Sequence, residues 1–402
     1  MIATTSCNKD MYDEEEAQKW TDVLSPIDSV DQAHTWKLTT IHQLRVTAGT
    51  RTGAQSVLIL SANPTTSDAS LLARASVSDG ETVSLSFSAP TLSTQFVAAI
   101  LDAAGQYTLT EFPAGQESVT VQGNPVNVYT KMSPQVYTYC YNAEFPYPDN
   151  DYDYNDLVLR ISLERAAKRE VDIGVTLAAV GTNKQVAAAI RLVDYNYSDI
   201  DSIVVVGGQG FSNDIPGQSY EIIGSKSTLI SGRNNEAVLN LFEDAHWSMG
   251  DRLSTNYGLF LRKYYNVSSS TEGDYQLLSP RTVTYRVYFK DDSRLNNFSF
   301  NSIDPFIIED YNGLFWEVHQ YEYIAAQTKY EYPVSNIKNL PWAFEIPDAN
   351  FRHPYQGINI GFIKDGVTFG AYMTNGCSFG EWAENHTKST NWYLYPTKNM
   401  VY

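Results

Sequence analysis

Cysteine is scarce in this chain. The 402 residues include only Cys7, Cys140 and Cys377. Three cysteines form neither a disulfide framework nor the paired spacing of a zinc site. If Cys7 has another role, Cys140 and Cys377 are one potential disulfide pair, and two buried free thiols fit the sequence equally well.

Positive charge and long apolar runs are also missing. The net charge is −18 and no basic run occurs, which argues against nucleic acid as a partner. No apolar run reaches the ~18 to 20 residues of a membrane helix. The acidic balance is typical of a well-solvated extracellular surface.

Enzyme signatures are absent as well. The chain has no nucleophile elbow, zinc-protease motif, phosphate-binding loop or dinucleotide fingerprint, and the glycines of 207–210 do not fit the last of these. Glycoside hydrolysis stays open, because the separation of its two carboxylates is set in three dimensions. We expect a protein that is not an enzyme.

Aromatic residues are plentiful, at 13% of the chain with 28 tyrosines, and tyrosine favours strands and exposed binding faces. The length favours two or more domains. Between 34 and 130, short β segments separated by turn-forming clusters predict a β-sandwich. The expected strands are 55–62, 82–89, 95–102 and 118–129.

A larger β unit is expected over 131–402. Apolar residues alternate with other residues in 136–141, 157–164 and 171–177, which is the period of a half-buried strand. Asn312-Gly313 lies between two further apolar segments and indicates a hairpin turn. No helical pattern exceeds about two turns. The predicted class is all-β, with packed antiparallel sheets in the second unit.

The N-terminus, 1–33, has the pattern of a lipoprotein start and tether. Small residues before Cys7 resemble a bacterial lipoprotein cleavage box, which would make Cys7 the lipidated first residue of the mature protein. The acidic run after it resembles the surface-export tethers of Bacteroidetes lipoproteins. A signal peptide needs an apolar core of about 7 to 15 residues, so we expect the natural start to lie upstream or this copy to be trimmed. A plain acidic cytosolic N-terminus is the alternative.

One acidic segment, 144–156, stands between two predicted strands. It reads EFPYPDNDYDYND and contains no Lys or Arg. Carboxylates this close repel one another unless a cation lies among them. Oxygen ligands at alternate positions are typical of calcium sites. The spacing resembles the start of an EF-hand loop, but the required glycine and distant glutamate are missing. The alternative is a solvated acidic turn.

The same segment resembles the signature of the LruC-domain family, β-rich domains of bacterial surface lipoproteins common in Bacteroidetes. The resemblance rests on Phe145-Pro146 followed by 151–158, DYDYNDLV, and continues through 235–246, 304–319 and 340–393. It covers roughly 134–402, and the Asp-Tyr-Asp-Tyr-Asn-Asp string is its specific part.

The resemblance implies a calcium site. Its ligands by position would be Asp151, Asp153, Asn155 and Asp156, with Glu144 a weaker candidate. Asp149 would lie just outside the ligand set. Tyr152 and Tyr154 are expected to point away and pack.

Two functions fit these features. The first is a cell-surface lipoprotein, anchored in the outer membrane by lipid and stabilised by calcium, with an adhesive or surface-structural role and a host or glycan ligand. The alternative is a carbohydrate-binding lipoprotein of a nutrient-uptake system. Its sugar platforms would be late tryptophans, although core packing is the favoured role of these side chains: Trp316, Trp342, Trp382 and Trp392.

Overall fold

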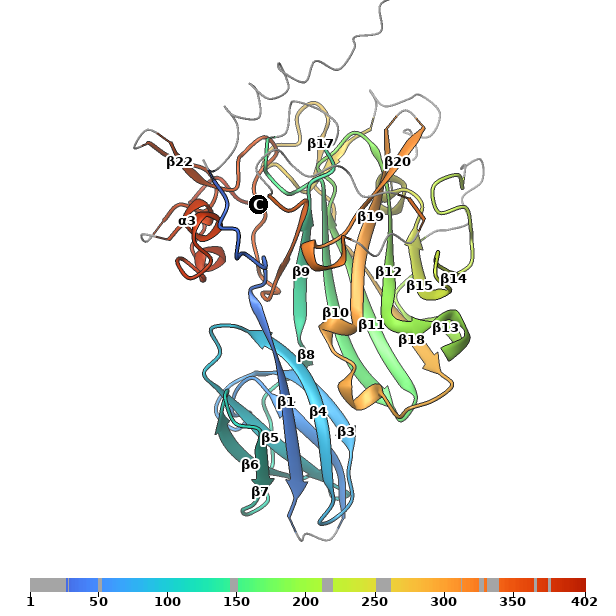
Figure 1. Ribbon diagram of the computed structural model, residues 1–402, viewed down its shortest axis with the longest axis vertical. Coiled ribbons are helices and arrows are strands. Elements are labelled where there is room, and N and C mark those ends of the chain that lie inside the picture. Colours follow the sequence, from blue (N-terminus) through green and yellow to red (C-terminus); the bar gives the residue numbers. More distant parts are fainter. Residues whose placement is uncertain are drawn as a thin grey trace, which may run out of the picture.

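The computed structural model consists almost entirely of β-strands (Figure 1). It describes residues 27, 29–49, 53–144, 151–211, 220–250, 262–311, 313–324, 329–330, 340–364, 367–374 and 377–402. Within these residues the helices are short, as the absence of long helical patterns predicts. They are α2 (Ala245–Met249), α3 (Phe379–Glu384) and the 3₁₀ segments η1 (Tyr197–Asp199), η3 (Leu295–Asn297), η4 (Phe300–Ser302), η5 (Tyr321–Tyr323) and η6 (Trp392–Leu394).

The N-terminal unit is a sandwich of two sheets. One sheet has the order β4-β1-β7 and the other β6-β5-β2-β3-β8. The strands are β1 (Thr39–Ala48), β2 (Ala54–Leu60), β3 (Ala69–Ser76), β4 (Thr82–Pro90), β5 (Gln95–Asp102), β6 (Tyr107–Pro113), β7 (Ser118–Val121) and β8 (Met132–Pro134).

Period-2 burial explains these strands. In β4, Val83, Leu85 and Phe87 face the core between the sheets. The expected strand at 118–129 is wrong in its length, because β7 ends at Val121. Gly123 follows with a φ of 130°, and Pro125 cannot donate to a ladder, so the chain turns away.

The larger unit packs two more sheets face to face. Their orders are β13-β18-β11-β10-β9-β21 and β14-β15-β12-β19-β20, with antiparallel pairs throughout. The strands are β9 (Val136–Tyr141), β10 (Leu157–Ala167), β11 (Glu170–Ala179), β12 (Gln185–Asn196), β13 (Ile200–Gly207), β14 (Leu229–Ser231), β15 (Glu236–Phe242), β18 (Arg281–Phe289), β19 (Ile303–Tyr311), β20 (Leu314–Val318) and β21 (Ala343–Ile346).

Their shared core confirms the alternation read from the sequence. Tyr137, Tyr139 and Tyr141 of β9 are fully buried in it. They lie beside the odd-numbered apolar residues of β10 and β11. Gly313 has a φ of 83°, as the hairpin between β19 and β20 requires. Two small pairs complete the fold, β16 (Tyr264–Tyr265) with β17 (Tyr275–Gln276) and β22 (Phe362–Lys364) with β23 (Val367–Phe369).

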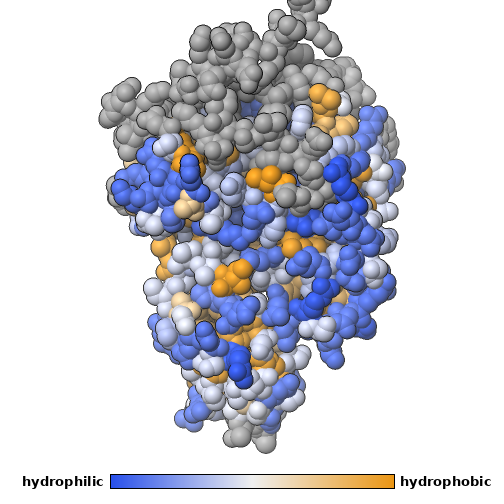
Figure 2. All heavy atoms as spheres, in the orientation of Figure 1, coloured by the Kyte–Doolittle hydropathy of each residue, from blue (hydrophilic) through white to orange (hydrophobic). Residues whose placement is uncertain are grey.

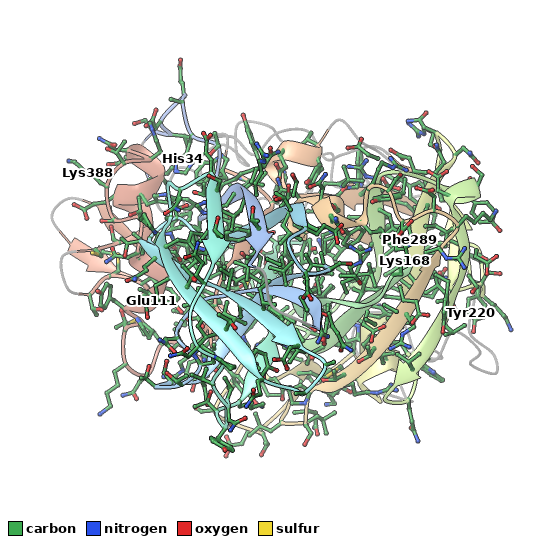
Figure 3. The ribbon with its side chains drawn as sticks, turned by 90° about the horizontal axis from the view of Figure 1, so that it is seen from below. His34, Glu111, Lys168, Tyr220, Phe289 and Lys388 are labelled. Carbon is green, nitrogen blue, oxygen red and sulfur yellow. The ribbon has the colours of Figure 1, made fainter. Side chains whose placement is uncertain are left out.

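The described part of the segment before β1 is packed against the rest of the protein and does not form a free tether. Trp36 is only 5% exposed and packs with Phe379 and Trp382 of α3. His34 stacks on Trp36 at 3.9 Å between ring centroids. Figure 1 shows this dark-blue segment beside the red C-terminal elements, and Figure 3 places His34 there too. The tether predicted through residue 33 therefore ends no later than Ile27, which lies in the same cluster.

The two units also touch directly. β8 pairs in parallel with β3, so the first unit extends to Pro134, just beyond the predicted boundary at 130. The Tyr137 hydroxyl donates to Ser88 Oγ at 3.1 Å across the junction. Hydrophilic residues dominate the face in Figure 2. None of the helices in the described part of the chain is long and apolar enough to cross a membrane.

Candidate metal centre

The acidic segment connects two neighbouring strands, as its position in the sequence predicts. β9 ends at Tyr141 and β10 begins at Leu157, and the two pair antiparallel from that point. Glu144 and 151–156 are described, whereas 145–150, which include Asp149, lie outside the described residues. Because the flanking strands are fixed in the core, both ends of the acidic loop are anchored.

A repeated side-chain turn shapes this loop. Asp151 Oδ1 accepts from Asp153 N–H at 3.2 Å, and Asp153 Oδ1 accepts from Asn155 N–H at 3.0 Å. Asp and Asn favour such turns because their short side chains reach the backbone two residues on. The alternation of Asp with another residue therefore specifies the backbone as well as the charge.

The intervening tyrosines adopt the left-handed conformation. Tyr152 has a φ of 55° and Tyr154 a φ of 53°, which is uncommon for bulky residues and persists only where the surroundings enforce it. Both rings are fully buried among aromatic residues of the C-terminal region. The Tyr154 hydroxyl donates to Pro341 O at 2.9 Å. The tyrosines thus point away from the carboxylates, as predicted.

Backbone donors close the loop around its acidic side chains. Glu144 Oε2 accepts from Asp151 N–H at 2.9 Å, and Asp156 Oδ2 accepts from Ala143 N–H. Gly357, from the distant C-terminal region, donates its N–H to Asp153 Oδ2 at 2.9 Å. Backbone donors therefore link the two ends of the acidic loop to each other and to the C-terminal region.

Asp153 and Asp156 are buried, whereas Glu144 and Asp151 are half-buried. Burial raises the pKa of Glu144 and of Asp153 well above the ordinary range, and neighbouring charges, Asp151 foremost, raise both further. Burial, with Asp151 beside it, raises the pKa of Asp156 to about 7. Burial also raises the pKa of Asp151. The anionic forms are costly here, which is the electrostatic condition that a bound cation relieves.

Lys184 supplies part of the opposite charge. Its Nζ lies 2.5 Å from Glu309 Oε1 and also donates to Ala143 O, next to the loop. Its charge acts to lower the pKa values of Glu144 and Asp156. Burial nevertheless raises the pKa of Glu309 to about 8. Sequence reasoning missed this pair because both residues are far from the acidic segment along the chain.

The donor set suits a hard cation. Asn155 is fully buried, and its Oδ1 has no hydrogen-bond partner within the described structure. Asn155 Nδ2 donates to Asp153 Oδ2 at 2.7 Å and to Pro354 O at 3.1 Å. Carboxylate and amide oxygens are the ligands that calcium prefers. Among the described residues, no group of three or more His, Cys, Asp or Glu side chains converges closely enough to hold a metal.

Two histidines, His246 and His319, lie outside the acidic loop and bond to groups within the core. His319 is fully buried, with Nδ1 2.8 Å from Asp304 Oδ2 and Nε2 3.2 Å from Glu317 Oε2. Arg191 Nε donates to the same Asp304 oxygen at 3.0 Å. His246 Nε2 lies 2.7 Å from Thr182 O. Both histidines therefore bond within the core, although His246 Nδ1 has no hydrogen-bond partner within the described structure.

The tryptophans expected in a sugar-binding role are mostly internal. Trp342, Trp382 and Trp392 are 5%, 1% and 0% exposed, so they pack the core and offer no exposed face. Cys140 and Cys377 are free thiols and do not form the potential disulfide, and of the two only Cys140 is buried while Cys377 is half-buried. Cys7 lies outside the described residues.

Comparisons with known proteins give a family and a fold. The model of the family described as "Domain of unknown function (DUF4842)" matches residues 169–393. Curated protein sequences give no match. The crystal structure of a "Putative lipoprotein from Bacteroides ovatus" is similar with a TM-score of 0.54 and 15% identity, over 87% of this chain and 99% of that one. The acidic loop precedes the matched family region.

Proposed function

This chain belongs to the DUF4842 family, and we propose that it is a non-enzymatic surface lipoprotein whose acidic loop holds a structural calcium ion. Its role is adhesive or surface-structural, at the outer membrane. The LruC resemblance is part of this proposal, because its specific string coincides with the loop. The Bacteroides ovatus protein, similar in fold, bears a name of the same class.

One observation carries the calcium assignment. Buried and half-buried carboxylates from both ends of the acidic loop raise one another's pKa values while an amide oxygen among them lacks a partner. The residues that would hold the ion are Glu144, Asp151, Asp153, Asn155 and Asp156. Bound calcium would supply positive charge that offsets their repulsion. The loop would then hold the β9–β10 connection against the C-terminal region through Gly357 and the buried tyrosines.

Calorimetric titration tests the calcium assignment. The native protein should bind calcium, and Mg²⁺ should substitute poorly because it demands octahedral geometry and retains its waters. Asp153→Ala should weaken binding at least tenfold. Asp291→Ala is the matched control, because Asp291 Oδ1 caps Ser293 N–H at 2.8 Å in an equivalent but exposed turn. Equal calcium binding by both variants would remove Asp153 from the site.

Membrane fractionation tests the anchor. The full natural coding sequence should be expressed in the native host, once unchanged and once as Cys7→Ala. The native protein should fractionate with the outer membrane and react with externally added protease, whereas Cys7→Ala should be soluble. Unchanged fractionation of the variant would contradict lipidation at Cys7, and it would leave the calcium result unaffected.

A further inference from the structure

The two sheets of the larger unit have four margins, and three of these are short or covered by other described segments. β14 has only three residues. β20 is bordered by Tyr330, whose N–H donates to Glu317 Oε1 at 3.0 Å. β21 packs Phe344 and Ile346 into the cluster that also holds Trp382. Short or covered margins keep a sheet from pairing with other chains.

The fourth margin, β13, is long and open. It has eight residues and pairs with β18 alone, at the end of its sheet (Figure 1). Among the described residues, no backbone hydrogen bond joins 201–208 to a segment other than β18. The backbone N–H and C=O groups on the outer side of β13 are therefore available to a further strand.

Three consecutive valines make this margin apolar. Val204, Val205 and Val206 are 41%, 42% and 45% exposed. Val204 stands opposite Arg286 of β18 and faces outward. Val205 stands opposite the buried Tyr285 and faces inward, yet the second sheet leaves it exposed at this margin. Both faces of the edge thus offer apolar surface to a partner strand.

The open strand is already fixed in the conformation that pairing requires. Ile200 and Ile203 anchor it in the core between the two sheets. Its register with β18 is regular from Ser202 to Val205 and shifts before Gly207. A strand that is ordered beforehand loses little conformational freedom when another strand is added.

The open segment carries no charged side chain, although the chain is strongly acidic. No Asp, Glu, Lys or Arg occurs from Ser202 to Gly210, whereas the net charge is −18. Arg286, opposite Val204, is paired with Asp172 at 2.7 Å. Two acidic copies of this chain repel each other over most of their surfaces, so close approach is least opposed at this segment.

We infer that β13 pairs antiparallel with β13 of a second copy, about a two-fold axis near Val204, and joins two six-stranded sheets into one continuous sheet. A two-fold pair uses the same surface twice and closes the dimer. β13 is the one long margin that the described strands of the larger unit leave open, so it is also the surface that a second copy can present. In this arrangement the two Asp201 side chains lie roughly 20 Å apart along the strands, beyond the screening length of about 8 Å.

The N-terminal unit does not obstruct this pairing. It meets the larger unit at β9 and β10, where Tyr137 donates to Ser88 and Arg74 lies 3.6 Å from Glu164. These strands are separated from β13 by β11 and β18. The inference goes beyond the proposed calcium-stabilised role and does not depend on the acidic loop.

Sedimentation velocity of the full chain tests the dimer. One strand pair buries less than the roughly 1,200 Å² of a standard interface, so we expect a dissociation constant on the order of 10 to 100 µM and measurement from about 1 to 300 µM. Val204→Lys should raise the dissociation constant at least tenfold, because like charges would stand directly opposite. Leu314→Lys is the matched control, at a side chain 59% exposed on the β20 margin, and should dimerise like the native protein. Both variants should melt like the native protein, because both side chains are exposed.

Disulfide trapping tests the antiparallel arrangement. Directly opposite residues in an antiparallel pair have Cα atoms about 4.5 to 5.5 Å apart, which a disulfide can span. Val204→Cys should therefore form a covalent dimer under mild oxidation, well above the background given by the native cysteines, whereas Leu314→Cys should not. Equal trapping of the two variants, a native protein that stays monomeric throughout, or a dimer that Val204→Lys leaves intact would overturn the inference.

Discussion

Single residues fix the acidic loop through close packing as much as through charge. A Cβ added at Gly181 would lie 1.7 Å from Asn155 Oδ1 and 2.7 Å from Asn155 O. Gly181 also donates its N–H to Asp156 O at 3.1 Å. Only a residue without a side chain lets Asn155 take its buried position, so this glycine belongs to the loop although it lies on another strand connection.

Replacing Gly181 should therefore disrupt the loop. We expect Gly181→Ala to lower the free energy of unfolding by roughly 2 kcal/mol or more, because the neighbouring backbone must move, and to weaken calcium binding. Gly115→Ala is the control, since a Cβ there meets nothing within 4 Å. Urea unfolding measures the free energy of unfolding of both variants. A Gly181→Ala protein as stable as Gly115→Ala would contradict the tight packing of Asn155.

His319 gives the buried charge network a pH dependence. Burial alone would lower the pKa of His319, but Asp304 and Glu317 raise it from 6.5 to about 9. Because the pKa of His319 is higher in the folded than in the unfolded state, its protonation stabilises the native state. This stabilisation is fully present below about pH 6.5. This contribution is lost as pH rises to about 9, and its size is about 3 kcal/mol.

Unfolding measured between pH 6.5 and 9 tests this network. The native protein should lose stability across the interval, and His319→Gln should lose less, with the remaining loss coming from carboxyl groups of raised pKa such as Glu309. His353→Gln is the control, because burial lowers the pKa of His353 to about 4, so this ring stays neutral throughout. An equal slope in the native and His319→Gln proteins would show that His319 does not carry the charge.

Whole elements cooperate across long sequence distances. The segment before β1 packs on α3 near the opposite end of the chain, with Asp31 N–H donating to Ala383 O at 3.0 Å. Its aromatic side chains complete a cluster that also holds Tyr152 and Tyr154. The N-terminal segment therefore supports the same region that anchors the acidic loop.

Removing one aromatic ring should expose this dependence. Trp36→Ala should lower the stability by about 3 to 5 kcal/mol, the usual range for a buried tryptophan. The effect should be local, so hydrogen exchange should accelerate in α3 more than in β2 and β5 of the N-terminal sandwich. Tyr129→Ala, at a side chain 90% exposed, should change neither. Uniform acceleration over both units would contradict a local role.

Sequence patterns predicted the strands and the placement of the acidic loop, because both depend on local periodicity. The buried tyrosines of β9 and the loop follow from alternation within a few residues. Patterns could not predict that Lys184 and Glu309 meet, or that Arg191, Asp304 and His319 form one network. The contacts of Lys184 with Glu309 and of Arg191 with Asp304 each join residues more than a hundred positions apart. The packing of Trp36 was missed for the same reason.

Across the whole molecule, the acidic loop lies where the two-sheet core meets the C-terminal region. Lys184 and Glu309 approach it from the core, and Gly357 contacts it from the C-terminal region. A cation that binds only the folded arrangement stabilises the molecule by about 2.7 kcal/mol when its free concentration is ~100 times the dissociation constant. Calcium should therefore raise the stability of the large unit as a whole.

Thermal melting with and without a calcium chelator tests this central claim most directly. The native protein in millimolar calcium should lose several degrees of melting temperature on chelation. Asp153→Ala should melt low in both conditions and respond little, while Asp291→Ala should behave like the native protein. A native melt that chelator leaves unmoved, together with no calcium binding by calorimetry, would show that the acidic loop is folded by its own hydrogen bonds and holds no ion.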